Sequence, residues 1–146
     1  MLDHTDLKSR LSDPDLLRDK AFVAGEWVAA ASGKSFPVTN PARGDTICTV
    51  PDLDESEVAH AIDAADEARK EWAARTGKER AAVLRKWYEL MVANADDLAA
   101  ILTAEMGKPL AEAKGEILYG ASFIEWFSEE AKRVYGETIP GHQRDK

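Results

Sequence analysis

The most constraining feature of this sequence is a segment near its carboxyl end that is apolar on nearly every side. The segment from Ile117 to Phe127 belongs to a predicted helix that runs from Pro109 to about Tyr135. Two stripes at helical spacing are Leu110, Ala113, Ile117, Ile124 and Ala131 on one side, and Gly115, Tyr119, Phe123 and Trp126 on another, with Leu118 and Phe127 between them. We expect such a helix to be buried on more than one side.

The rest of the chain offers too little apolar surface to cover this helix completely. Three helices are predicted before it, over about 54–76, 78–93 and 95–106. Their expected apolar positions are Val58, Ile62, Ala65 and Trp72, then Leu84, Trp87, Leu90 and Met91, then Leu98, Ile101 and Leu102. These helices can cover about one side of the last one. Either the chain oligomerises through the last helix, or further polypeptide covers it.

Local signals mark the ends of these helices. Asp54 followed by Glu57 has the capping-box pattern of a helix start. Thr76-Gly77 is interpreted as the end of the first helix, and Gly107 as the stop of the third. Pro109 suits the first turn of the last helix.

The first third of the chain is predicted to be a small β region behind an amino-terminal arm. Residues 7–20 indicate a short polar helix or arm that is broken at Asp13-Pro14. Residues 22–28 indicate two short strands about a turn at Gly25-Glu26. Residues 40–45 form a strong turn signal, and Thr46 to Val50 follow as a strand that Pro51 closes. The expected chain is therefore a small β region followed by about four helices.

Composition excludes several classes of protein. The 146 residues fit one domain, and their net charge of -8 argues against a nucleic-acid partner, which needs clustered Lys and Arg. No apolar run approaches the roughly 20 residues of a membrane span. An acidic start, with no cationic stretch leading into an apolar one, argues against a secretory signal. A cytoplasmic protein is expected.

A search for catalytic groups finds no site in this chain. Cys48 is the only thiol, has no neighbouring His in the sequence, and is interpreted as a small buried side chain. No glycine-rich phosphate loop follows a strand. The acidic pairs are expected to be solvated or ion-paired: Asp96-Asp97, Glu129-Glu130, and Glu112 with Glu116.

Two glycines in the last helix, Gly115 and Gly120, carry a cost in helix stability relative to Ala. They indicate close approach of another group to this helix, and a polypeptide backbone is favoured over a ligand.

Several stretches, taken in order, resemble the aldehyde dehydrogenase superfamily. Residues 22–27 (FVAGEW) are similar to its INGEW strand and turn, and residues 38–45 (VTNPARGD) to its NPATGE turn. The helical pair around 61–84 and the 105–113 segment (EMGKPLAEA) match its next two landmarks. Within the last helix, residues 115–119, 123–130 and 133–136 resemble the succinate-semialdehyde dehydrogenase branch.

The resemblance implies an α/β parent fold with a doubly wound cofactor domain, a catalytic domain and an oligomerisation hairpin. Residues 1–20 would be an amino-terminal arm, and residues 21–146 the incomplete amino-terminal part of the cofactor-binding domain. The implied enzyme uses NAD or NADP, takes a small-molecule aldehyde, and assembles as a homodimer or homotetramer. The catalytic and cofactor-binding residues are expected beyond Lys146, so this fragment alone is predicted to be inactive and loosely packed or aggregating.

The resemblance also implies two sets of site residues within this chain. Relatives hold a monovalent cation through an acid just before Gly-Lys-Pro and a carbonyl near the Asn-Pro turn, which correspond to Glu105 and Thr39. The usual acid is often Asp, and Glu is longer. The last helix lines the substrate tunnel in relatives, through positions that correspond to Gly115, Tyr119 and Phe123.

Three functional hypotheses remain open at this point. The first is a fragment of a succinate-semialdehyde dehydrogenase that oxidises the semialdehyde to succinate in the intact enzyme. The second keeps the enzyme class but takes another ω-carboxylated aldehyde, such as glutarate semialdehyde. The third is a non-enzymatic helical interaction module that uses its apolar helix as a dimer face.

Overall fold

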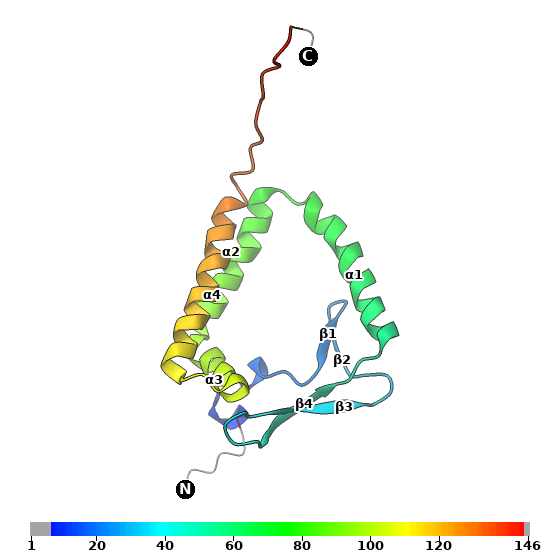
Figure 1. Ribbon diagram of the computed structural model, residues 1–146, viewed down its shortest axis with the longest axis vertical. Coiled ribbons are helices and arrows are strands. Elements are labelled where there is room, and N and C mark those ends of the chain that lie inside the picture. Colours follow the sequence, from blue (N-terminus) through cyan, green and yellow to red (C-terminus); the bar gives the residue numbers. More distant parts are fainter. Residues whose placement is uncertain (1–6, 145–146) are drawn as a thin grey trace.

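The computed structural model describes residues 7–144 and shows two small hairpins beside four helices (Figure 1). Strand β1 (Ala21–Val23) pairs antiparallel with β2 (Glu26–Val28), and β3 (Ser35–Thr39) pairs antiparallel with β4 (Thr46–Pro51). The predicted order of a β region followed by four helices is confirmed.

The first hairpin turns at Ala24-Gly25, one residue earlier than predicted. Both turn residues have positive φ, 51° and 90°, and Glu26 pairs with Val23 as the first residue of β2. A two-residue loop with positive φ at both positions matches the twist of the flanking strands. The side chain of Glu26 therefore belongs to the strand and not to the turn.

Strand β3 was not among the predicted strands, and Pro37 lies in its middle. Pro37 stands opposite Thr49 in the ladder. In a sheet of two strands both strands are edges, so a residue without an N–H group is tolerated. The predicted strand over residues 46–50 is confirmed as β4, which includes Pro51.

Helices α1 (Glu55–Ala74) and α2 (Gly77–Ala93) both begin with a capping box. Asp54 and Glu57 exchange hydrogen bonds of 3.0 and 2.9 Å, as predicted. At α2 the Thr76 hydroxyl accepts from the Glu79 N–H at 3.3 Å, and the Glu79 carboxylate accepts from the Thr76 N–H at 2.8 Å. Thr76-Gly77 thus starts a helix, and reading it only as the end of the first helix was incomplete.

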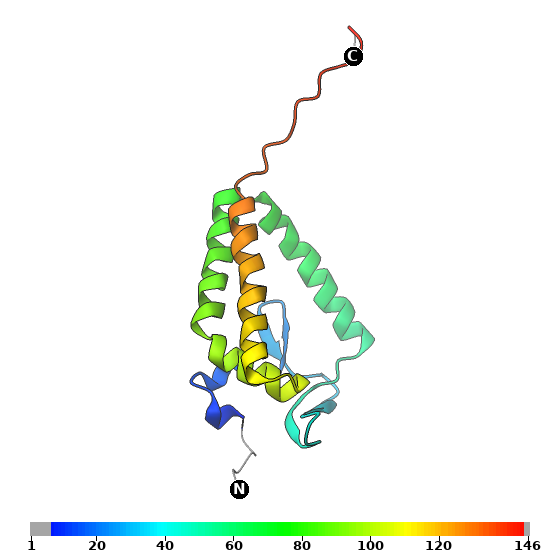
Figure 2. The ribbon, with the colours of Figure 1, turned by 60° about the vertical axis from the view of Figure 1, so that its left-hand side comes forward.

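Helix α3 (Ala95–Met106) stops as predicted at Gly107, which has a φ of 83°. Helix α4 (Leu110–Glu130) starts after Pro109 but ends about five residues before the predicted Tyr135. Ala131 still lies against Gly77 of α2, but Val134 and Tyr135 beyond it are exposed. The backbone there leaves the helix and extends away from the other elements (Figure 2).

The core lies where α4 packs along α2 and α3, and small side chains dominate it. The buried residues of these three helices are Ala81, Ala95, Asp97, Ala99, Ala113, Ala121 and Ser128. Small residues let two helix backbones approach closely, so the seam is tight although no large side chain is fully buried in it.

The predictions about the inner faces were only partly correct. On α2, Leu84 and Met91 are half-buried as predicted, while Trp87 and Leu90 are exposed. The seam follows the row that starts at Ala81, so Trp87 and Leu90 fall on its far side. On α1 no residue is buried, because that helix leans away from the α2–α4 pair (Figure 1).

The arm contains two single 3₁₀ turns, η1 (Lys8–Arg10) and η2 (Pro14–Leu16), in place of a continuous helix. The predicted break at Asp13-Pro14 is confirmed, since Asp13 caps the second turn. No helix within residues 7–144 is both long enough and apolar enough to span a membrane.

Candidate functional site

Two of the three predicted tunnel residues, Tyr119 and Phe123, belong to the outer face of α4, and Gly115 precedes them by one turn. This outer face is defined as the exposed side chains of α4 that point away from α2 and α3, namely Leu118, Tyr119, Ser122, Phe123, Trp126 and Phe127. Tyr119 is 65% exposed and Phe123 is 47% exposed, and Gly115 is exposed one turn before them. The predicted placement of Gly115, Tyr119 and Phe123 on one side of the helix agrees with this geometry.

The aromatic rings of the outer face are ordered against one another. Tyr119 and Phe123 meet edge to face, with ring centroids 4.9 Å apart. This is a preferred geometry for aromatic pairs. A shallow hollow of about 700 Å³ follows along the helix, and its lining residues are Ser122, Phe123, Glu125, Trp126, Phe127 and Glu129. Such a concentration of exposed apolar surface marks a place where another group binds.

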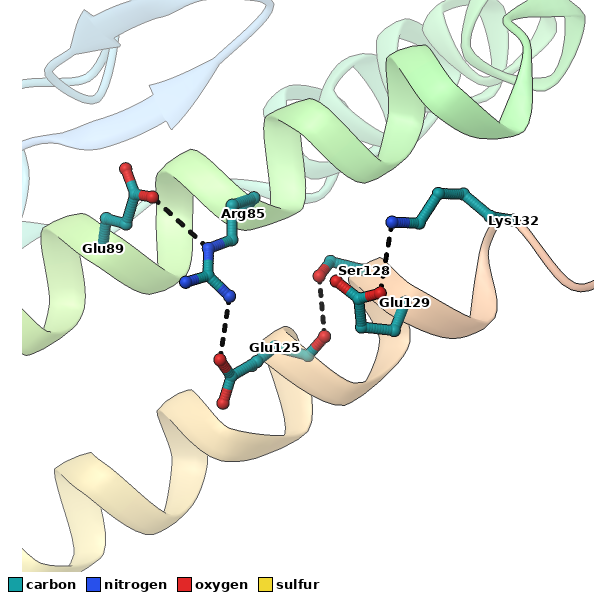
Figure 3. A network of polar contacts seen from close by, with 6 residues as sticks. All are labelled: Arg85, Glu89, Glu125, Ser128, Glu129 and Lys132. Carbon is teal, nitrogen blue, oxygen red and sulfur yellow. Dashed lines mark hydrogen bonds and ion pairs between the residues drawn. The ribbon is translucent and has the colours of Figure 1, made fainter.

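The edge between the outer face and the seam is polar. Arg85 of α2 donates to Glu125 of α4 at 2.8 Å and to Glu89 of its own helix at 3.3 Å (Figure 3). The two carboxylates raise the pKa of the Arg85 guanidinium. Ser128 is 1% exposed, and its hydroxyl donates a hydrogen bond to the Glu125 carbonyl at 2.7 Å. This buried hydroxyl therefore has a hydrogen-bond partner.

The two helix glycines have no close neighbour within residues 7–144. A Cβ atom placed on Gly115 or on Gly120 would meet nothing within 4 Å. The predicted close approach is therefore not made by this part of the chain. By contrast, a Cβ on Gly77 would collide with the Ala131 carbonyl at the end of α4. Gly77, which permits a close backbone approach, was not one of the two glycines for which such an approach was predicted.

A second concave region lies where the turn over residues 40–45 meets the end of α3. The cleft has a volume of about 520 Å³. Its lining residues are Leu7, Arg10, Asn40, Ala42, Arg43, Asp45, Thr46, Ile47, Ala100, Thr103, Ala104, Gly107 and Leu110. The Thr103 hydroxyl is buried and has no hydrogen-bond partner among the described residues.

The turn that forms one wall of this cleft is fixed by Asn40, which is buried. Its side-chain oxygen accepts from the Ala42 N–H at 2.9 Å, and its carbonyl accepts from the Gly44 N–H at 2.7 Å. Arg43 and Asp45 form a two-pronged ion pair at 2.7 Å on each prong, which raises the pKa of Arg43. The ring of Pro41 lies against Gly107, where an added Cβ would be only 3.2 Å away. Two motifs whose contacting residues are 66 positions apart in the sequence thus meet.

The predicted cation ligands, Glu105 and Thr39, are both exposed and lie at the same end of the molecule. Thr39 ends β3, and its neighbour Val38 pairs with Cys48. Burial raises the pKa of the Cys48 thiol, and the nearby charge of Glu105 raises it further. Glu105 is therefore within electrostatic range of this hairpin. Among residues 7–144 there is no group of three or more His, Cys, Asp or Glu side chains that could hold a metal ion.

The expectation that Asp97 is solvated was wrong. Asp97 is 8% exposed, and its two carboxylate oxygens accept from the N–H groups of Ser12 and Asp13 at 3.0 and 2.8 Å. These hydrogen bonds lower the pKa of Asp97. Asp96 beside it is exposed and pairs with Lys114 at 2.6 Å. Adjacent helix positions point in different directions, so only one of the two meets the arm.

The remaining acids behave as predicted. Glu116 pairs with Lys108, Glu129 with Lys132, and Glu130 with Arg133. Cys48 is a free and partly buried thiol, which agrees with a structural role. The candidate functional features among the described residues are the outer face of α4 and the cleft beside the turn over residues 40–45.

Comparison with known proteins identifies the family of this chain. The aldehyde dehydrogenase family model matches residues 27–146. The glutarate-semialdehyde dehydrogenase of Pseudomonas putida is 59% identical over 94% of this chain and 28% of its own length. The NADP(+) succinate-semialdehyde dehydrogenase of Escherichia coli is 56% identical over the same two fractions.

A solved aldehyde dehydrogenase from Brucella melitensis superposes with a TM-score of 0.89 and 59% identity, over 92% of this chain and 28% of that one. The chain thus spans a little more than a quarter of the length of the relatives it matches. On these grounds, the chain belongs to the aldehyde dehydrogenase family.

Proposed function

We propose that this chain contributes the amino-terminal part of an enzyme that oxidises succinate semialdehyde to succinate with NAD or NADP. The outer face of α4 supports the proposal, because it exposes Tyr119, Phe123 and Trp126 on a helix that is tightly packed on its opposite side. Further polypeptide of the same protein would cover part of this face and leave part of it beside the substrate path. The enzyme would work in the cytoplasm as a homodimer or homotetramer.

A second substrate is favoured by a specific observation. Of the relatives described above, the glutarate-semialdehyde dehydrogenase has the higher identity, 59% against 56%. The two substrates differ by one methylene group, which a pocket discriminates by only about 10- to 200-fold. The ratio of kcat/KM for the two semialdehydes, measured on the whole enzyme, decides between them.

The proposed role of the outer face is tested on the whole enzyme. Phe123→Ala and Tyr119→Phe should change KM for the semialdehyde or its chain-length preference by roughly tenfold, the scale of one or two lost contacts. Gly115→Ala should also change KM for the semialdehyde, in this case because the added methyl group narrows the path. Phe22→Ala is the matched control, because Phe22 is an exposed aromatic residue on β1, away from α4.

Two outcomes would contradict this proposal. Turnover by the 146-residue chain alone would show that the catalytic groups lie within it. A whole protein that carries this segment, binds neither NAD nor NADP and forms dimers through α4 would support the non-enzymatic interaction module instead.

We also propose that Glu105, with the carbonyl of Thr39, holds a monovalent cation in the whole enzyme. The exposed position of both residues at one end of the molecule supports this. Glu105→Gln should abolish any dependence of activity on added K⁺ or Na⁺. Glu112→Gln is the control, an exposed acid in the first turn of α4. Equal cation dependence in both variants would refute the site.

A further inference from the structure

The amino-terminal segment 7–20, here called the strap, is tied to α3 by one side chain. Asp97 lies in the first turn of α3, and each of its two carboxylate oxygens accepts one backbone N–H from the strap, those of Ser12 and Asp13. Hydrogen bonds to an ionised acceptor are stronger than those between neutral groups. The distances of 3.0 and 2.8 Å show that both are formed.

Apolar contacts hold the strap on either side of this carboxylate. Leu11 and Leu17 are both buried, although the strap contains only two short 3₁₀ turns. At its far end the Arg18 guanidinium lies 5.0 Å from the centre of the Trp27 ring, within cation–π range. The strap is therefore held on both sides of the two N–H groups that bind Asp97.

The docked strap forms one wall of the 520 Å³ cleft. Leu7 and Arg10 line the cleft together with Thr103, which lies further along the helix that carries Asp97. The Thr103 hydroxyl is buried at this place without a hydrogen-bond partner among the described residues. A polar atom in that situation is costly unless water or another group can reach it.

We propose that the strap is a movable wall of this cleft, and that Asp97 is the latch that holds it closed. While the two N–H groups are bound to Asp97, Leu7 and Arg10 stay against the cleft and restrict access to Thr103. When the latch is broken, the strap loses its two hydrogen bonds to a charged side chain, and solvent gains access to Thr103. Local opening of a weakly held segment needs far less free energy than global unfolding.

The test uses an introduced cysteine as a reporter of access to the cleft. Thr103→Cys is built into a Cys48→Ala background of the whole protein, and its rate of labelling by a maleimide is measured by mass spectrometry of the peptide that carries position 103. Adding Asp97→Asn should raise this rate by roughly 10- to 100-fold, because two hydrogen bonds to a charged acceptor are weakened. Asp96→Asn is the matched control, one residue away and exposed, and should leave the rate unchanged.

A second reporter separates local opening from global loosening. Ser128→Cys places the thiol in the α2–α4 seam, far from the strap in the chain, where the native residue is 1% exposed. The proposal requires that Asp97→Asn accelerate labelling at position 103 and not at position 128. Equal acceleration at both positions, or no acceleration at position 103, would overturn it.

A variant that leaves Asp97 intact gives an independent check. Leu11→Ser removes one apolar anchor of the strap and should also speed labelling at position 103. Trypsin should then cleave faster after Arg10 and Arg18 in both Leu11→Ser and Asp97→Asn. Unchanged cleavage in both variants would show that the strap does not move with this latch.

Discussion

The two faces of α4 are built from opposite kinds of side chain and meet opposite surroundings. The inner face presents Ala113, Ala121 and Ser128, all at most 1% exposed, to α2 and α3. The outer face presents Tyr119 and Trp126, both more than 60% exposed. One helix thus buries a row of small side chains and exposes its large aromatic rings.

The difference shows that the amount of apolar surface does not decide which face packs within this chain. Helix α2 offers its own small residue, Ala81, along the seam, so two backbones come close and the contact is dense. Large rings could enter such a seam only by forcing the helices apart. The apolar area of the outer face remains available for contact with another surface. We propose that this surface is further polypeptide and substrate.

The largest effect is expected from filling the inner face. Ala121→Leu adds three carbon atoms where the native side chain has no exposed surface, and should destabilise the chain by about 3 kcal/mol. Ala111→Leu makes the same change at an exposed position of the same helix and should have little effect. Urea unfolding followed by circular dichroism compares them. Equal stability of the two variants would mean that the seam is not close-packed.

The second-largest effect on stability is expected from replacing the glycine at the seam, Gly77, and it is compared with replacement of the exposed Gly115. Gly77→Ala drives a methyl group into the Ala131 carbonyl and should cost about 1 to 2 kcal/mol. Gly115→Ala meets nothing within 4 Å and should stabilise α4 by roughly 0.5 to 1 kcal/mol. Thermal unfolding should therefore shift in opposite directions. A shift in the same direction would contradict the assignment of one glycine to each environment.

A smaller effect is expected at the polar edge between the two faces. Glu125→Gln removes the ion pair that joins α4 to Arg85 of α2, and exposed pairs of this kind contribute little. The change in unfolding temperature should be small and should vanish in about 1 M salt, where exposed charges are screened. A large loss that persists in high salt would show that the edge, and not the alanine seam, joins the helices.

The smallest effect on the isolated chain is expected on the outer face itself. Trp126→Ser should change the free energy of unfolding by no more than about 0.5 kcal/mol, because the ring is already exposed. The same substitution should reduce self-association of the chain, measured by sedimentation velocity. In the whole enzyme it should instead lower stability, since further polypeptide would cover the ring. A strongly destabilised isolated chain would show that α4 has no free face.

Sequence reasoning succeeded where a residue acts on its near neighbours. The Asp54–Glu57 capping box and the Gly107 stop were predicted correctly, because both depend on groups within four residues. Reading Thr76-Gly77 only as the end of the first helix missed the second capping box, since the signal of Glu79 three residues later was not used. Strand β3 was also missed, and it contains Pro37, a residue type that is disfavoured in most strands.

Contacts between distant segments could not be predicted in this way. Asp96 and Asp97 have the same charge and nearly the same place on α3, and only the position of the strap, more than 80 residues earlier, distinguishes them. The same holds for Gly77, whose close neighbour lies at the far end of α4. Nothing in the local pattern of either residue reports such a neighbour.

By itself the sequence determined the four helices, the apolar character of α4 on nearly all sides, and the ordered motifs of its family, since each depends on local periodicity or spacing. Only the tertiary structure decided which face of α4 is buried, that α1 buries no residue, and that Asp97 binds the strap. Periodicity records which residues share a face, whereas the packing of small side chains across two helices selects the face that is enclosed.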